Sequence, residues 1–220
     1  MKYIKKYHFL IHILLIICAV VIIGLRLIDM RKPKSIEIER KSGMEEKVPV
    51  ISDEPTIDFE KLRKKYNNKN IKGAIRINNS NFEEVVFQTK DNSYYLKHNY
   101  RGKKSNGEIF IDYRLDIDKS DIKVIYGEGT SLSNEFNNYY DKKYYEQHKF
   151  IELESDKSIY KYEVLSLIEK KVTHDNFNIT NILEKSLYVY NDEVKDNKEY
   201  LIIVNKNNGK YYSIIGKKVN

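Results

Sequence analysis

The chain of 220 residues has no tryptophan, three prolines and a single cysteine. That cysteine, Cys18, falls within an apolar stretch near the N-terminus, so the rest of the chain carries no thiol. A body without cysteine cannot contain a disulfide, and its stability must come from its core. It also offers no sulfur nucleophile. About 160 residues suffice for such a core, because a domain of this size buries roughly two thirds of the surface of its chain.

The formal net charge of +7 does not indicate a nucleic-acid partner. Residues 1–56 hold 10 of the 39 Lys/Arg residues and 7 of the 32 Asp/Glu residues, which leaves 29 basic and 25 acidic residues for the body. Charges of both signs are interspersed there and no basic helix stands out, as is typical of a solvated surface. No pair among His98, His148 and His174 has ligand spacing on one face, so we expect neither a metal site nor a cofactor.

An apolar run at residues 9–28 is long enough to cross a hydrocarbon core. The preceding tail, residues 1–8, carries Lys2, Lys5 and Lys6, which favours a cytoplasmic N-terminus and an exported C-terminal body. Basic residues also follow the run and weaken this orientation. A cleaved signal peptide is the alternative, but no small-x-small cleavage site follows the run. We therefore predict a single-pass anchor in the cell membrane with an extracellular body.

The remaining chain divides into a linker and one domain. All three prolines lie between Met30 and Thr56, and residues 29–56 are polar without periodicity, as expected of a stalk. Residues 57–220 contain eight short segments rich in Ile, Val, Tyr and Phe, which predict a mostly β domain with few helices, a barrel or a sandwich. The expected strands are Ala74–Ile77, Glu84–Gln88, Glu108–Asp112, Ile122–Tyr126, Phe150–Glu154, Tyr160–Ile168, Tyr200–Val204 and Lys210–Ile215.

Three helices are expected among these strands, because apolar residues recur there at helical spacing. One begins the body at Phe59, and a second lies within Asn134–His148 with Ser133 as a plausible N-cap. The third is expected around the apolar face of Ile179, Ile182, Leu183 and Leu187.

Several segments, in order and spacing, resemble the class B sortases. They are Ile71–Ile77, Gln88–Gly102, Glu108–Arg114, Val124–Gly127 and Asn134–His148. The resemblance implies an eight-stranded sortase-type β-barrel with added helices behind an N-terminal transmembrane helix. It also implies a family chemistry in which a cysteine attacks the scissile carbonyl of a sorting signal and passes the acyl group to a cell-wall or pilin amine.

The residues that this chemistry requires are altered. The resemblance places the family histidine at Glu128, the cysteine at Asn205 or Lys206, and the arginine at Lys210. The connection between the last two strands is also shortened. Lys210 keeps a positive charge without the fork of arginine, but no substitute restores a nucleophile. Loss of the nucleophile in comparable triads costs about a millionfold in rate. These positions therefore predict a vacated site, and no catalytic residue is assigned.

We therefore hypothesise that the chain is a cell-surface protein that serves as a peptide- or protein-binding accessory module. This role is favoured over an enzymatic one. Its partner would be a surface-protein sorting peptide, bound by strand addition or in a pocket, or an active sortase. The alternative is an active peptidase or transpeptidase with a non-standard nucleophile and Glu128 as acid/base. A purely structural envelope protein is a third possibility.

A serine or threonine site assembled in space is the other route to activity. The hydroxyl groups near Glu128 are Thr130, Ser131 and Ser133, and no histidine neighbours them in sequence. The candidate bases would be His98, His148 and His174. Such a pair is not favoured, and sequence alone leaves it open.

Overall fold

The computed structural model describes residues 17, 20, 21, 36–40, 54–170, 199–207 and 210–219, with only the backbone described at 168–170, 207 and 210. The chain separates into two units, residues 1–35 and 36–220, and each is considered by itself. In the first unit the described residues 17, 20 and 21 are helical, and the rest of the expected anchor at 9–28 lies outside the described residues. Among the residues described, no helix has the length and hydropathy of a membrane crossing.

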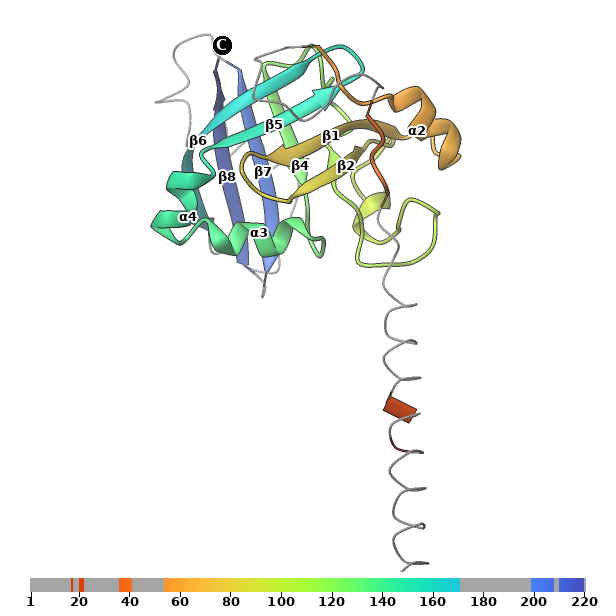
Figure 1. The fold of residues 1–220 in the computed structure, drawn as a ribbon, viewed down its shortest axis with the longest axis horizontal. Helices are drawn as coiled ribbons and strands as arrows, with labels where there is room; N and C mark the ends of the chain where they lie inside the picture. The colour runs from red at the N-terminus through yellow and green to blue at the C-terminus, as the bar shows by residue number, and fades with distance from the viewer. Residues whose placement is uncertain are drawn as a thin grey trace, which may run out of the picture. The chain divides into compact units, whose positions relative to one another are not determined.

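The second unit contains eight strands and several short helices (Figure 1). The helices are α2 (Phe59–Lys65), the 3-10 turn η1 (Tyr94–Leu96), α3 (Leu132–Asn138) and α4 (Lys142–Gln147). The strands are β1 (Ile71–Ile77), β2 (Glu83–Phe87), β3 (Phe110–Ile111), β4 (Ile122–Tyr126), β5 (Phe150–Ser155), β6 (Ile159–Lys170), β7 (Tyr200–Asn207) and β8 (Lys210–Lys218).

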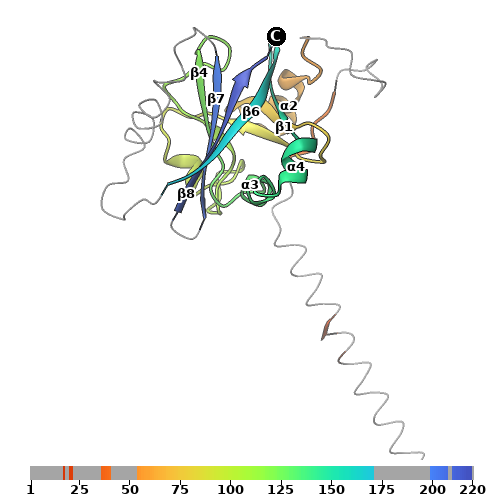
Figure 2. The same cartoon turned by 90° about the vertical axis from the view of Figure 1, so that its left-hand side faces the viewer.

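These strands close into a barrel in the order β1-β2-β3-β4-β7-β8-β6-β5. Among the described strands, six of the eight neighbouring pairs are antiparallel; β2 and β3 pair in parallel at Phe87↔Phe110, and β4 and β7 pair in parallel from Ile122↔Tyr200 to Tyr126↔Val204. Strands β4 and β7 run side by side in both views of the barrel (Figures 1 and 2). Their parallel pairing brings the carboxyl ends of β4 and β7 to the same rim of the barrel.

Alternation along the described strands produces two large apolar clusters and a small third one of Tyr200 and Ile215. The first fills the barrel with residues from every strand, among them Ile125 and Leu201, and helix α3 adds Leu132 and Phe136. The second lies on the opposite faces of β1–β4 and β7, beneath α2 and the segment between β2 and β3. Successive side chains of one strand therefore enter different clusters, as the twofold repeat of a strand requires.

The expected mostly β barrel is confirmed, and each of the eight expected strands overlaps an observed strand. The single helix expected within Asn134–His148 is wrong, because the chain turns at residues 139–141 and begins again with Asp141 as the cap of α4. The Asp141 side chain accepts a hydrogen bond from the Tyr144 N–H at 2.8 Å, which satisfies an orphan donor of the new helix.

Ser133 is not the N-cap that was expected. Helix α3 already begins at Leu132, with Ser131 at the cap position and no side-chain cap bond. The buried Leu132 fixes this start by packing into the barrel cluster. The third expected helix, around Ile179 and Leu187, lies outside the described residues.

Part of the expected stalk contacts the body. Residues 36–40, here called the strap, pair with the body through an Arg40↔Ile57 bridge, and Ile36 and Ile38 pack against the second apolar cluster. Glu39 of the strap forms ion pairs of 2.5 Å with both Lys61 and Lys65 of α2. Hydrogen bonds from these two lysines lower the pKa of Glu39 to about 2.

The carboxylate of Glu154 fixes the start of the body. It is 3% exposed and accepts hydrogen bonds from the Thr56 N–H at 2.5 Å and the Ile57 N–H at 2.6 Å. The Thr56 hydroxyl donates to the same carboxylate at 3.0 Å. Since Ile57 is itself buried, Glu154 ties the entry of the chain to strand β5.

Substitution of Glu154 tests this connection. We expect Glu154→Gln to lower the free energy of unfolding by about 1–3 kcal/mol, because hydrogen bonds to a charged acceptor are worth roughly twice those to a neutral one. Urea unfolding would measure the loss. The control is Glu146→Gln on the exposed α4 helix, where the carboxylate lies 3.8 Å from Lys142 and a cost below about 0.5 kcal/mol is expected. Equal stability of the two variants would contradict the anchoring role.

Glu108 is a half-buried carboxyl group that precedes β3. It accepts a hydrogen bond from the Tyr100 N–H at 2.8 Å. Burial raises the pKa of Glu108 to about 7, against the opposing hydrogen bond from Tyr100, and the nearby carboxylate of Glu84 adds to the rise. Burial also raises the pKa of Glu84, which accepts a hydrogen bond from the Ser131 hydroxyl at 3.0 Å.

This raised pKa makes stability depend on pH. Below about pH 4.5 Glu108 is protonated in both states, whereas between 4.5 and about 7 the unfolded chain releases the proton that the folded protein keeps. Stability should therefore fall as pH rises through this window, by about 3 kcal/mol in total. Unfolding measured across this range should show a shallower slope for Glu108→Gln than for the wild type. The control is Glu146→Gln, and parallel slopes for wild type and Glu108→Gln would refute the assignment.

Candidate functional site

The site begins where β4 and β7 end together. The parallel register sets Tyr126 beside Val204, and the Gly127 N–H extends the ladder by donating to the Val204 carbonyl at 3.0 Å. Glu128 lies two residues after the end of β4 and is thereby placed next to Asn205 and Lys206 on β7. Three of the four positions singled out from sequence therefore converge on one rim of the barrel.

Glu128 and Lys206 face each other on the outer side of this rim. The Lys206 Nζ lies 3.9 Å from a carboxylate oxygen of Glu128, and it also lies 5.2 Å from the ring centroid of Tyr211 on β8. The side chains of Lys206 and Glu128 are 30% and 40% exposed. This arrangement is a partly solvated charge pair over an aromatic ring.

Asn205 points the other way, into the barrel, and is 1% exposed. Its Oδ1 accepts hydrogen bonds from the Ser133 hydroxyl at 2.9 Å and from the Lys206 N–H at 2.8 Å. The Ser133 hydroxyl also lies 3.3 Å from the Gly127 carbonyl. Asn205 therefore joins β7 to helix α3 beneath the rim, and its amide is enclosed by protein.

Lys210 lies at the start of β8. Its backbone pairs with Asn207, so only residues 208 and 209 separate the paired positions of β7 and β8. This register confirms the short connection expected between the last two strands. The Asn208-Gly209 sequence is the preferred pair for such a hairpin. The side chain of Lys210 lies outside the described residues.

Gly127 is required by close packing under the rim. A Cβ at this position would lie 2.4 Å from a terminal methyl carbon of Leu132 and 3.0 Å from its Cβ, so any larger residue would force Leu132 to shift. The next glycine, Gly129, has a φ of +74°, which favours glycine. The Tyr-Gly-Glu-Gly sequence thus turns the chain sharply from β4 into α3 and leaves Glu128 projecting at the turn.

A hydrogen-bonded network supports β4 from the outer side. Asp112 is fully buried and accepts from Arg114, Asn92 and the Tyr126 hydroxyl, at 2.8 Å, 2.8 Å and 3.1 Å. Burial opposes ionisation of Asp112, but the hydrogen bonds from Arg114 and Asn92 outweigh it and hold its pKa below the usual range. Sequence reasoning did not single out this network, although Asp112 and Arg114 lie in a family-like segment.

The hydroxyl groups near Glu128 have partners other than histidine. Thr130 donates to the Gly127 carbonyl at 2.7 Å, and Ser131 donates to Glu84. His98 contacts the Tyr94 carbonyl, while His148 contacts the carbonyls of Tyr144 and Asn79. No hydrogen-bonded Ser–His or Thr–His pair occurs within 54–170, 199–207 and 210–219. His174 lies outside the described residues. Within the same ranges, no group of acidic, histidine and cysteine side chains could hold a metal ion.

Curated relatives of this chain are sortases. It is 34% identical over 119 residues to Sortase B of Listeria monocytogenes, a match that covers 51% of this chain and 46% of that protein. It is 25% identical over 182 residues to Sortase B of Staphylococcus aureus, covering 79% of this chain and 73% of the relative. The chain thus spans about half of the Listeria protein and nearly three quarters of the staphylococcal one. No protein-family model matches.

Solved structures agree on the fold. A structure of sortase B from Bacillus anthracis superimposes with a TM-score of 0.61 at 18% identity, covering 84% of this chain and 90% of that one. A Staphylococcus aureus sortase B–substrate complex gives a TM-score of 0.57 at 21% identity, covering 74% and 84%. In sequence and in barrel topology, this chain is therefore similar to the class B sortases.

Proposed function

We propose that this protein is a membrane-anchored, class B sortase-like protein of the cell surface that does not perform cysteine transpeptidation and instead binds a peptide or protein partner. The observation that carries the proposal is the Glu128–Lys206 pair beside the buried Asn205 at the rim where β4 and β7 end. With Cys18 as the only cysteine, the body has no thiol to place there.

The chemistry of the rim supports inactivity. Acyl transfer needs a nucleophile within reach of a proton-transfer group and donors for the oxyanion. Asn205 has an amide and is enclosed. Lys206 is reachable, but its ammonium is attracted by Glu128 and by the ring of Tyr211. Lysine nucleophiles are activated by apolar or cationic surroundings, and those of Lys206 are the opposite.

The same rim suits recognition. Glu128 and Lys206 offer a partly exposed carboxylate and ammonium at the ends of two strands, above the buried ring of Tyr211. The described strands close into a barrel, so strand addition to an open edge is not favoured. We propose instead that an extended peptide is held by side-chain contacts at this rim. One solved structure of sortase B from Staphylococcus aureus is a complex with its substrate, which supports ligand binding by this fold.

Membrane anchoring is part of the proposal. It is supported by the apolar run at residues 9–28 and by the lysine-rich tail before it. In this arrangement residues 36–220 face the cell exterior. Digestion of intact cells with a protease should remove the body, while residues 1–8 remain protected.

Activity is tested with the full chain in detergent, a panel of sorting-signal peptides and an amine acceptor. We expect neither cleavage nor transfer, because loss of a nucleophile in comparable enzymes lowers the rate about a millionfold. Mass spectrometry of the protein should detect no acyl adduct. An active class B sortase assayed in parallel is the positive control. Turnover that Glu128→Gln abolishes would overturn the proposal and favour a non-standard nucleophile.

Binding is tested with fluorescent versions of the same peptides. We expect Lys206→Ala or Glu128→Ala to weaken binding roughly two- to fivefold, since a partly exposed charge contributes up to about 1 kcal/mol. The matched control is Lys142→Ala, which removes an exposed lysine from α4. Fluorescence anisotropy would measure the dissociation constants. Binding that all variants retain equally would place the ligand elsewhere.

A further inference from the structure

The loop between η1 and β3 presents a concentrated basic surface. Its four basic residues are Lys97, Arg101, Lys103 and Lys104, and all four are exposed. The sequence contains no acidic residue from 93 to 107. Among the described residues none of the four forms an ion pair, although Arg101 bonds the hydroxyl of Tyr100 at 2.9 Å. We refer to residues 97–104 as the basic loop.

Hydrogen bonds of the backbone and of the Asn99 side chain fix the conformation of the basic loop. His98 and Lys104 form an antiparallel bridge, and the Asn99 side chain accepts from the N–H groups of Arg101 and Lys103, both at 3.0 Å. Gly102 adopts a φ of +73° that closes the turn. The Tyr100 N–H is tied to Glu108. The charges are therefore displayed by a fixed turn, which reduces the ordering cost of binding.

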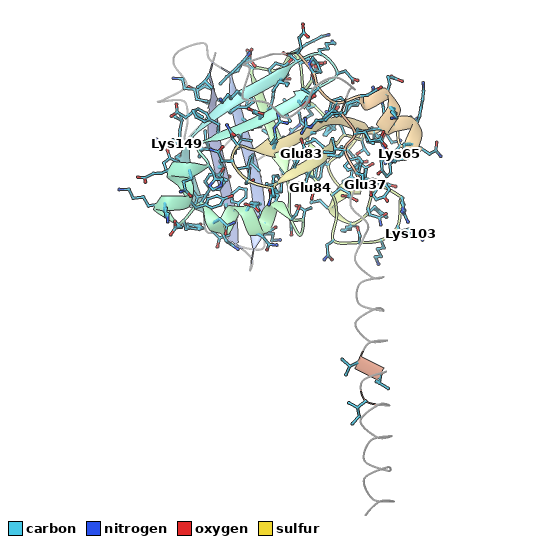
Figure 3. All side chains as sticks on the ribbon, viewed as in Figure 1. Glu37, Lys65, Glu83, Glu84, Lys103 and Lys149 are labelled. Carbon is cyan, nitrogen blue, oxygen red and sulfur yellow. The ribbon has the colours of Figure 1, made fainter. Side chains whose placement is uncertain are left out.

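The basic loop lies beside the place where the chain enters the body. The Glu37 N–H donates to the Tyr66 hydroxyl at 2.9 Å, and the Tyr66 ring packs edge-on against the Tyr100 ring with centroids 5.6 Å apart. One aromatic ring thus separates the strap from the basic loop. Figure 3 shows Glu37 and Lys103 on the same side of the barrel, with Lys149 on the opposite side.

Chain length limits how far this surface can stand from a membrane. With an anchor at residues 9–28, the seven residues 29–35 connect it to Ile36, the first residue of the second unit. Seven residues span at most about 25 Å when fully extended. The strap is held to α2 by ion pairs from Glu37 and Glu39 to Lys65. While these contacts are intact, the strap does not lengthen the connection between the anchor and the body.

We propose that the basic loop binds the anionic headgroups of the membrane in which the chain is anchored. The lipid surface is favoured over a soluble partner because the short connecting segment keeps the body close to the membrane, and basic residues that reach the surface are attracted to anionic headgroups. Two nearby acids, Glu37 and Glu39, are paired with lysines of α2 and do not cancel the loop. Glu108, which accepts the hydrogen bond from the Tyr100 N–H, is half-buried. This inference rests on the proposed anchor.

The test uses the full chain in lipid nanodiscs, with either zwitterionic phosphatidylcholine alone or a mixture containing anionic phosphatidylglycerol. A water-soluble acylating reagent then labels lysines, and mass spectrometry reports the rate at each position. We expect Lys103 and Lys104 to react several-fold more slowly in anionic discs, since each basic residue at such a surface gains about fivefold in partitioning. High salt should restore the rate. Lys143, exposed on α4, is the internal control.

A charge-reversal variant separates lipid binding from simple proximity. Lys103→Glu/Lys104→Glu should abolish the slower labelling of Lys97 in anionic discs, whereas the matched variant Lys142→Glu/Lys143→Glu should preserve it. Equal labelling of the basic loop in both disc types would overturn the inference. Failure of the chain to enter discs at all would instead overturn the proposed anchor, so the two failures are distinguishable.

Discussion

The parallel pairing of β4 with β7 is the constraint on which the architecture of this protein depends. It brings two segments about 80 residues apart in sequence to one rim, with Tyr126 opposite Val204. Parallel neighbours need a long connection, and the strands β5 and β6 return along the far side of the barrel within that connection. The contact between Glu128 and Lys206 at the rim follows from this register.

Much of the barrel could be predicted from the sequence. Ile, Val and Tyr recur in short segments bounded by polar turns, and all eight of these segments are strands. The break between α3 and α4 could not be predicted in the same way. Tyr139 and Tyr144 continue an apolar face without a glycine or proline between them, and the break depends on Asp141 capping a new helix. The strap was also missed, because its contacts with α2 are ion pairs between residues distant in sequence.

The candidate site was predictable in position but not in geometry. Family order alone located Glu128, Asn205 and Lys206, and these three do converge. The different orientations of Asn205 and Lys206 were not predicted, although the alternation of side chains along the strand indicates them. Leu201, Ile203 and Asn205 share the inward face, and Lys206 therefore points outward. The distance between Lys206 and Glu128 depends on the turn at Gly127 and on the packing of Leu132 against it. Neither feature produces a periodic pattern of residue types from which it could be predicted.

The two ladders of strand β3 are the shortest among the described strands of the barrel, with one pair to β2 and two pairs to β4. Strand β3 has only two residues, and its ladder with β2 consists of the single pair Phe87↔Phe110. Local openings start where few hydrogen bonds must break. Local opening is therefore expected to begin at β3, while the eight-pair β6–β8 ladder stays intact. A local opening of this kind would let residues 88–109 change their position relative to the barrel without unfolding of the rest of the body.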